Sequence, residues 1–174
     1  MKNLIYFFEF LIIIILFTIF RIIGYRAASN LGFLIGKTFG PIFRSKKTII
    51  KNIKTFKSSI NDEELDEIIS NMWGNYGRIL AEYPFIPSFR KKKLENFLDI
   101  EGVENLKRIK DNKKPCVFIS GHFNNFELMA MLIEREGIDL SAVYRPLNNR
   151  FLNLIMEHLR LSLIHISEPT RPDE

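Results

Sequence analysis

The sequence predicts an α/β protein in which an N-terminal transmembrane helix and a helical segment precede a partial parallel βαβα domain. Residues 4–23 are apolar almost without interruption, and residues 61–83 carry apolar side chains at helical spacing. From residue 116 onward, short β-branched runs alternate with helical patterns, which is typical of a parallel sheet with right-handed crossovers. In order, we expect a strand at 116–120, a helix at 124–136, a strand at 140–144 and a helix at 148–160.

The N-terminus has the length and composition of a membrane span. Residues 4–23 are 20 residues interrupted only by Glu9 and Arg21, enough to cross a hydrocarbon core of about 30 Å. A signal peptide is the alternative, but Lys2 alone makes a weak n-region and the apolar run is over-long for one. We therefore expect an uncleaved anchor over residues 1–25. Glu9 should lie near the interface or face a partner helix, because a carboxylate in lipid is costly.

Nine basic residues and no acidic residue lie between positions 10 and 61. They are Arg21, Arg26, Lys37, Arg44, Lys46, Lys47, Lys51, Lys54 and Lys57. The positive-inside rule predicts that this segment is cytoplasmic, and with it the catalytic portion of the chain. A basic stripe can also bind nucleic acid or be a solvated helix face. Because this one follows an anchor, we expect it to contact anionic membrane lipid and no nucleic acid.

Two helices are expected to follow the anchor. The first carries Gly32, Gly36 and Gly40 at intervals of four residues, a ridge that permits close approach of another helix. The second begins at Asn61, whose side chain can cap the first turn, and ends at Pro84. Its apolar face is expected to be core.

A polar block follows the first expected strand, with the sequence Gly121-His122-Phe123-Asn124-Asn125-Phe126-Glu127. His122 falls where the strand ends and a helix begins, which is where ligands bind in α/β sheets. Asn124 or Asn125 can cap that helix, and Glu127 lies in its first turn. A histidine held there can accept a proton from a hydroxyl while the carboxylate receives its other ring N–H. A polar surface pair is the alternative interpretation of this spacing.

This block resembles the H-x4-D/E block of the lysophospholipid acyltransferase superfamily. It is most similar to the GHFxNWE form of the lipid A biosynthesis (lauroyl/myristoyl) acyltransferases, with Phe126 where tryptophan is usual. A second block, Val143-Tyr144-Arg145-Pro146-Leu147-Asn148-Asn149, resembles the next block of that family at the expected distance. The resemblance covers roughly residues 1–160. It implies that His122 is the general base, that Glu127 orients it and that Arg145 contacts substrate.

The resemblance implies a membrane-anchored acyltransferase, with residues 26–160 as the N-terminal part of its catalytic domain. Such an enzyme moves a fatty acyl group from acyl carrier protein or acyl-CoA to a hydroxyl of a lipid A precursor or related glycolipid. It is expected to be a single-pass protein of the bacterial inner membrane. We expect no cofactor and no metal, since the sequence has no H-E-x-x-H, CxxC, P-loop or G-x-G-x-x-G motif. A non-catalytic membrane-anchored fragment or interaction module is the alternative.

Residues 161–174 have no counterpart in the family pattern and resemble translated sequencing-adapter sequence. We therefore expect a non-native tail on an N-terminal fragment, and such a truncated chain is expected to lack part of the acceptor site. His165 lies in this tail and is not considered a ligand, and His158 is expected on a helix surface. Cys116 is the single cysteine, and we expect a buried, inert thiol.

Overall fold

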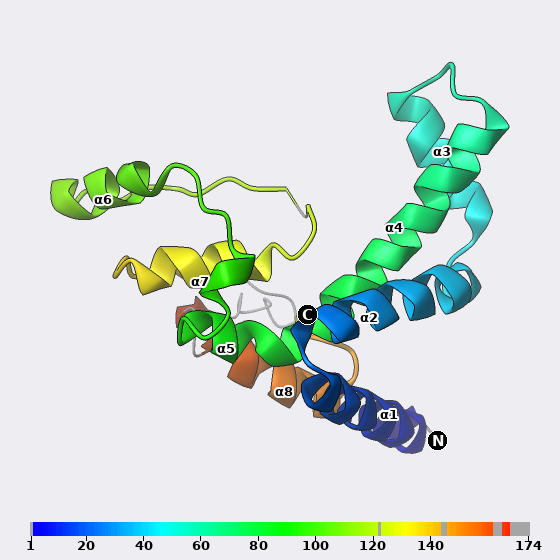
Figure 1. Cartoon of the computed structure of the whole chain (residues 1–174), viewed down its shortest axis with the longest axis horizontal. Coiled ribbons are helices and arrows are strands. Elements are labelled where there is room, and N and C mark those ends of the chain that lie inside the picture. Colours follow the sequence, from blue (N-terminus) through cyan, green and yellow to red (C-terminus); the bar gives the residue numbers. More distant parts are fainter. Residues whose placement is uncertain (1, 122, 144–145, 162–164, 168–174) are drawn as a thin grey trace, which may run out of the picture. The chain divides into compact units, whose positions relative to one another are not determined.

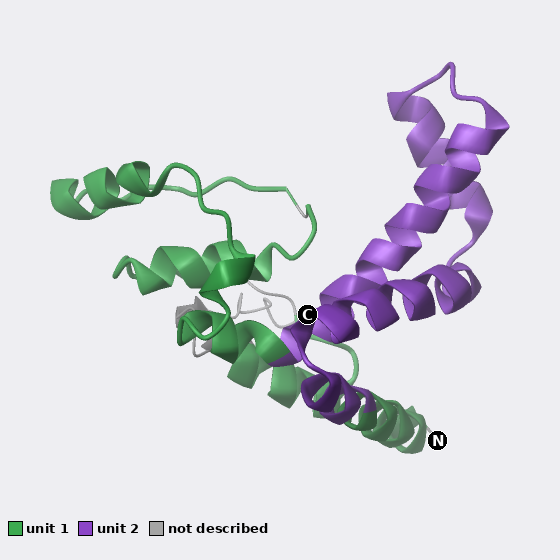
Figure 2. Ribbon diagram, in the orientation of Figure 1, with its two compact units in different colours: residues 1–15, 85–174 green, residues 16–84 purple. Residues whose placement is uncertain are grey.

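The computed structural model describes residues 2–121, 123–143, 146–161 and 165–167 (Figure 1). The chain divides into two compact units (Figure 2). Unit 1 contains residues 1–15 and 85–174, and unit 2 contains residues 16–84. Helices form most of the described structure in both units.

Helix α1 (Lys2–Ile23) lies where the membrane span was expected. It is long and apolar enough to cross a membrane, and little of it is covered by protein. Ten of its large apolar side chains are exposed, and six of them recur every three or four residues, which places these six along one stripe. The stripe consists of Ile5, Phe8, Ile12, Ile15, Ile19 and Ile22. An apolar surface of this kind, left uncovered by protein, suits contact with lipid.

Unit 2 is helical. After the second half of α1 come α2 (Tyr25–Phe39), the 3₁₀ turn η1 (Gly40–Ile42), α3 (Lys46–Phe56) and α4 (Asp62–Glu82). Asn61 caps α4 as predicted, because its side-chain oxygen accepts a hydrogen bond from the backbone N–H of Glu64 at 2.8 Å. Ile49 of α3 and Leu65 and Ile69 of α4 form a small apolar core.

The glycine ridge predicted on α2 brings α2 and α4 into backbone contact. A Cβ added to Gly36 would overlap the carbonyl oxygen of Trp73, and one added to Gly77 would overlap that of Gly32. A Cβ on Gly40 would lie 2.5 Å from the Trp73 ring. The prediction of close helix approach is therefore confirmed, and α4 contributes a glycine of its own that the sequence analysis did not single out.

A buried carboxylate joins α2 to the last turn of α4. Glu82 is 9% exposed, and the Ser29 hydroxyl donates a hydrogen bond to it at 2.8 Å. The Tyr25 hydroxyl also hydrogen-bonds to Glu82. Burial, reinforced by the neighbouring carboxylate, raises the pKa of Tyr25 to about 12. Hydrogen bonds from such hydroxyl groups offset the free-energy cost of burying a carboxylate.

Unit 1 contains both sequence blocks. The 3₁₀ turn η2 (Tyr83–Phe85) leads into it, and the elements that follow are α5 (Ile86–Arg90), η3 (Glu95–Phe97), α6 (Val103–Asn112), α7 (Glu127–Arg135), β1 (Ser141–Val143), α8 (Arg150–Leu161) and β2 (His165–Ser167). Helices α5 and α7 pack against each other. Ile86 and Phe89 of α5 and Met131 of α7 are fully buried. The two helices therefore form an apolar core, and α7 begins with the last residue of the first block.

The prediction of a parallel βαβα domain is wrong. Residues 116–120 form no strand, and Val117 and Ile119 are 87% and 93% exposed. In the part of the chain that the structure describes, the β-structure is one parallel pair, β1 with β2, in which Ser141 lies opposite His165. An apolar run becomes a strand only where a neighbouring strand pairs with its backbone and its apolar face is covered. Residues 116–120 have no such neighbour among the described residues.

The Cys116 thiol is exposed, so the prediction of a buried cysteine is wrong as well. That prediction depended on the strand at 116–120, since a strand between neighbours would have covered the side chain. Without the strand, the thiol stays at the surface.

Replacing the ridge glycine Gly36 by alanine should destabilise unit 2 by about 1–3 kcal/mol, because the methyl group must displace the backbone of α4. The matched control is Asn30→Ala, which changes an exposed residue of the same helix and should have little effect. Thermal unfolding of the detergent-solubilised protein, followed by circular dichroism, measures both. Equal unfolding temperatures for the two variants would mean that α2 and α4 are not in backbone contact.

The raised pKa of Tyr25 predicts a loss of stability in alkali. Folding favours the protonated phenol, so this contribution is complete below pH 10 and disappears as the pH rises towards 12. Wild-type stability should therefore fall relative to Tyr25→Phe across this window, while lysine titration cancels because both proteins share it. Denaturant unfolding at a series of pH values measures the difference. A difference that stays constant up to pH 12 would show that Tyr25 is not held in its neutral form.

Candidate active site

The first sequence block is only partly within the described structure. His122 lies outside the described residues, as does Arg145 of the second block. Glu127 is described, and it is the first residue of α7. Its side chain is buried, with the residue 3% exposed. The carboxylate thus lies in the first turn of a helix, where the helix dipole stabilises negative charge.

The start of α7 is not formed as predicted. Neither Asn124 nor Asn125 is the N-cap; Phe126 is, and no side chain caps the helix. Instead, the backbone carbonyls of Asn124 and Asn125 accept hydrogen bonds from the amides of Phe126 and Leu128, each at 3.1 Å. Asn124 has a positive φ of 47°, a conformation that asparagine tolerates better than most residues. A tight backbone turn, rather than a capping side chain, therefore precedes Glu127 at the start of the helix.

The far end of α7 is held by charged contacts. Arg135 donates two hydrogen bonds to the Glu95 carboxylate, at 2.6 and 3.0 Å. Glu134 forms an ion pair with Arg90 at 3.4 Å. Lys110 of α6 donates to the backbone carbonyl of Glu136 at 3.0 Å. These contacts fix the last turn of α7 to three separate segments and so limit rotation of the helix that carries Glu127.

Two of these groups have shifted pKa values. The hydrogen bond from Arg135 lowers the pKa of the Glu95 carboxyl, so that it stays ionised and paired. Burial lowers the pKa of the Arg90 guanidinium, opposed by the neighbouring Glu134 carboxylate. Arg90 still carries its charge at neutral pH, since the ordinary pKa of arginine is so high.

The second block ends at Asn149, a residue whose role the sequence analysis missed. Asn149 is 6% exposed, and its Oδ1 accepts hydrogen bonds from the amides of Phe151 and Leu152 at 3.1 and 3.3 Å. It is therefore the N-cap of α8. An asparagine directly before a helical pattern is a signal for such a cap, and it could have been found from the sequence.

Asn149 also contacts α1. Its Nδ2 donates to the Glu9 carboxylate and to the backbone carbonyl of Tyr6, both at 2.9 Å. Glu9 thus faces the start of another helix, α8, which was one of the two expectations for this residue. This contact joins residues 140 positions apart in the chain, and no local sequence signal predicts it.

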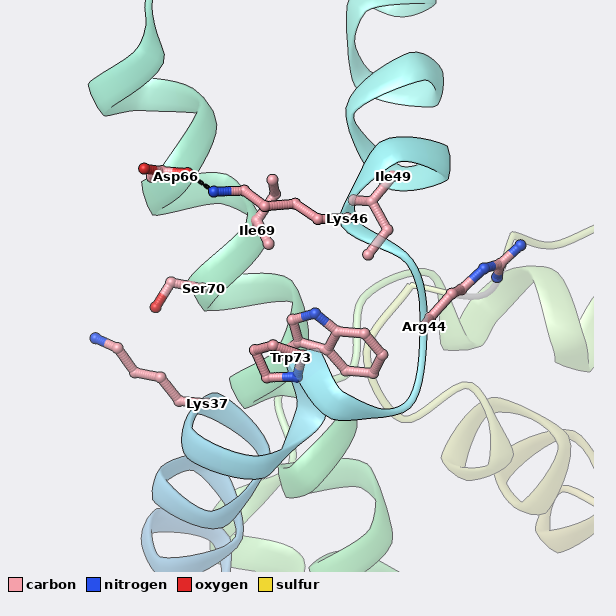
Figure 3. Close-up of a pocket in the computed structure, with 9 residues that line it drawn as sticks. Lys37, Arg44, Lys46, Ile49, Asp66, Ile69, Ser70 and Trp73 are labelled. Atoms are coloured by element: carbon pink, nitrogen blue, oxygen red, sulfur yellow. Dashed lines mark hydrogen bonds and ion pairs between the residues drawn. The ribbon is translucent and has the colours of Figure 1, made fainter.

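Unit 2 contains a cavity of about 230 Å³ beside Trp73, between α2, α3 and α4 (Figure 3). Lys37, Arg44 and Lys46 are among its lining residues. The Lys46 ammonium is paired with Asp66 at 2.7 Å. In Figure 3 the side chains of Lys37 and Arg44 point in different directions. The cavity is therefore a basic hollow in the surface and not a site where cations converge on one anion.

The described residues contain no group of three or more histidine, cysteine, aspartate or glutamate side chains that could hold a metal ion. His158, which was expected on a helix surface, is exposed on α8.

Comparison with known proteins agrees with the two sequence blocks. The family model of the bacterial lipid A biosynthesis acyltransferases matches residues 1–165. The chain is 25% identical over 140 residues to the lipid A biosynthesis palmitoleoyltransferase of Escherichia coli (strain K12). The lipid A biosynthesis acyltransferase of Shigella flexneri is 25% identical over the same length. No solved structure has significant similarity to the chain.

These matches cover 79% of this chain and 45% of each relative. The chain thus spans about half the length of the curated relatives it matches. Because the family model extends over nearly all of the chain, the resemblance inferred from the two blocks is confirmed. The chain belongs to the bacterial lipid A biosynthesis acyltransferase family.

Proposed function

We propose that the protein acts in a membrane-anchored acyltransferase that moves a fatty acyl group from a thioester to a hydroxyl of a lipid A precursor or related glycolipid. The donor is acyl carrier protein or acyl-CoA. The observation that carries the proposal is the buried carboxylate of Glu127 at the first turn of α7, in a block that has the family's spacing from His122. A carboxylate that is buried at this position is better placed to stabilise a cationic side chain than to contact solvent.

In the proposed mechanism, His122 is the general base. It accepts the proton of the acceptor hydroxyl as the hydroxyl oxygen attacks the thioester carbonyl. The carbon–sulfur bond then breaks, and the sulfur of the carrier leaves with the proton returned from the imidazolium. Glu127 receives the other ring N–H of His122, which fixes the tautomer and stabilises the imidazolium while it exists.

Arg145 is proposed to bind a phosphate or carboxylate of the substrate. A guanidinium matches such groups with two parallel hydrogen bonds. Its block ends at Asn149, which is buried and fixed at both of its polar ends.

The proposed location is the bacterial inner membrane, with α1 as a single span and the rest of the chain in the cytoplasm. The exposed apolar stripe of α1 supports the span. The basic side chains of α3, Lys47, Lys51 and Lys54, are exposed and can face anionic lipid headgroups, each worth about 1 kcal/mol near the surface. The same basic surface suits docking of an acidic carrier protein.

The catalytic prediction is for acyl transfer by the full-length protein, assayed with an acyl carrier thioester and a lipid A precursor. His122→Ala should lower kcat by about 10²–10⁴-fold, the usual contribution of a placed general base. Glu127→Gln should also impair turnover, because an amide cannot stabilise the imidazolium, and Glu127→Asp should retain part of it. Arg145→Ala should mainly raise the KM for an anionic substrate.

The matched control is His158→Ala, which removes an exposed histidine of α8 and should leave turnover unchanged. Circular dichroism establishes that each variant is folded. Near-normal turnover by a folded His122→Ala protein would rule out the mechanism and favour the alternative of a non-catalytic membrane-anchored module.

The proposed topology is predicted from the nine basic residues between positions 10 and 61, a stretch that contains no acidic residue. A reporter that is active only in the periplasm, fused after Lys57, should therefore give no signal, while a cytoplasmic reporter at the same position should be active. A strong periplasmic signal would reverse the orientation, and the proposed site would then have no access to a cytoplasmic acyl donor.

A further inference from the structure

The turn between α2 and α3 presents large apolar side chains at the surface of unit 2. Ile42 and Phe43, which we call the apolar tip, are 77% and 82% exposed. Phe39, the last residue of α2, is 54% exposed beside them. A soluble surface seldom leaves neighbouring side chains of this size uncovered, and such a patch marks a contact with another protein or with a membrane.

The turn is a fixed part of unit 2. The backbone amide of Phe43 donates a hydrogen bond to the carbonyl of Gly40 at 3.0 Å. The Trp73 ring of α4 packs so closely on Gly40 that an added Cβ would lie 2.5 Å from the ring. The apolar tip is therefore exposed because packing on α4 holds the turn in this position.

Basic side chains surround the apolar tip. Arg44 and Lys47, which we call the flanking cations, follow it in the sequence, and Lys37 lies in the last turn of α2. All three side chains are exposed, and none is paired with a carboxylate among the described residues. Apolar side chains next to unpaired cations are typical of segments that enter the interface of an anionic membrane.

The hollow beside Trp73 suits the same surface. Lys37 and Arg44 point in different directions there (Figure 3), so the headgroups of several neighbouring lipids can pair with them where one bound anion cannot. The indole Nε1 of Trp73 is buried and has no hydrogen-bond partner among the described residues. Tryptophan is enriched at the level of the headgroups, where its ring meets apolar groups and its N–H meets acceptors.

The opposite end of α3 provides a comparison within unit 2 (Figure 1). Phe56, at that end, is 94% exposed, more than either residue of the apolar tip. The chain then enters the first turn of α4, which carries Asp62, Glu63 and Glu64. These three carboxylates repel an anionic surface. The two ends of α3 thus share exposed aromatic side chains and differ in the sign of the charge nearby.

We propose that the turn between α2 and α3 is a second membrane contact of this chain. The apolar tip enters the interface of the cytoplasmic leaflet, and the flanking cations contact anionic headgroups. Helix α2 follows the proposed span directly through Gly24, so it begins at the membrane surface. Unit 2 is then attached to the bilayer at two points. This contact uses the proposed orientation of α1 and no step of acyl transfer.

An acidic carrier protein is the other class of partner that a basic surface suits. Its carboxylates would pair with the flanking cations but would leave the apolar tip in water. The membrane interface satisfies both features at once, since it offers anionic headgroups and an apolar layer beneath them.

Nitroxide labels test the proposal in the full-length protein, reconstituted in vesicles of phosphatidylcholine with phosphatidylglycerol. Phe43→Cys is labelled in a background without other cysteines, and Phe56→Cys is the matched control. The label at position 43 should collide more often with oxygen, which concentrates in lipid, than with a water-soluble nickel complex. The label at position 56 should do the reverse. Ile42→Cys provides an independent label on the same turn.

The charge is tested with the same label at position 43. Arg44→Gln with Lys47→Gln should lower the ratio of oxygen to nickel collisions about threefold or more, and omission of phosphatidylglycerol should act in the same direction. An unchanged ratio in both cases would overturn the assignment to anionic lipid.

Three results would overturn the membrane contact itself. The first is equal access of the nickel complex to positions 43 and 56. The second is shielding of position 43 from both oxygen and nickel, because the rest of the full-length chain then covers the turn. The third is shielding that begins only when acyl carrier protein is added. The acyl-transfer assay and the reporter fused after Lys57 are separate measurements, so failure here is distinguishable from failure of the proposed function.

Discussion

A carboxylate on an apolar helix needs hydrogen-bond donors, and in this chain the donor comes from the other end of the sequence. Glu9 accepts from Asn149, and Asn149 in turn caps α8. Within unit 1, Asn149 thus caps the first turn of α8 and joins the end of the second sequence block to α1. The aromatic contacts of Phe151 add an apolar component at the same place.

The first block is held in a different manner. Glu127 is buried at the start of α7, and no side-chain cap positions it. The helix is instead fixed by its apolar contact with α5 and by the ion pairs of Glu134 and Arg135 at its far end. Charged contacts at the surface contribute modestly one by one, but the two-bonded Arg135–Glu95 pair has a defined geometry that resists rotation. Unit 2 has in addition a backbone contact, because glycines place the backbones of α2 and α4 directly against each other.

Features that depend on neighbouring residues were predictable from the sequence, and features that depend on distant ones were not. The cap of α4 at Asn61 and the glycine ridge of α2 follow from local spacing, and the structure has both. The strand expected at 116–120 failed because a strand needs a partner, and the apolar pattern of Val117 and Ile119 cannot supply one. Asn149 was missed as the partner of Glu9 because 140 positions separate the two residues. The family was nevertheless identifiable, since two short blocks carry it whatever the surrounding fold.

The most direct test of α1 docking on the second block is chemical cross-linking in native membranes. In a Cys116→Ser background, Phe7→Cys with Phe151→Cys places two thiols at a contact whose rings lie 5.8 Å apart. The control pairs Phe151→Cys with Phe8→Cys, on the exposed stripe of α1. Docking of α1 on α8 predicts that a short bismaleimide closes an intramolecular link in the first protein and not in the second, seen as a faster-migrating band on a denaturing gel. Equal linking of both pairs, or of neither, would contradict it.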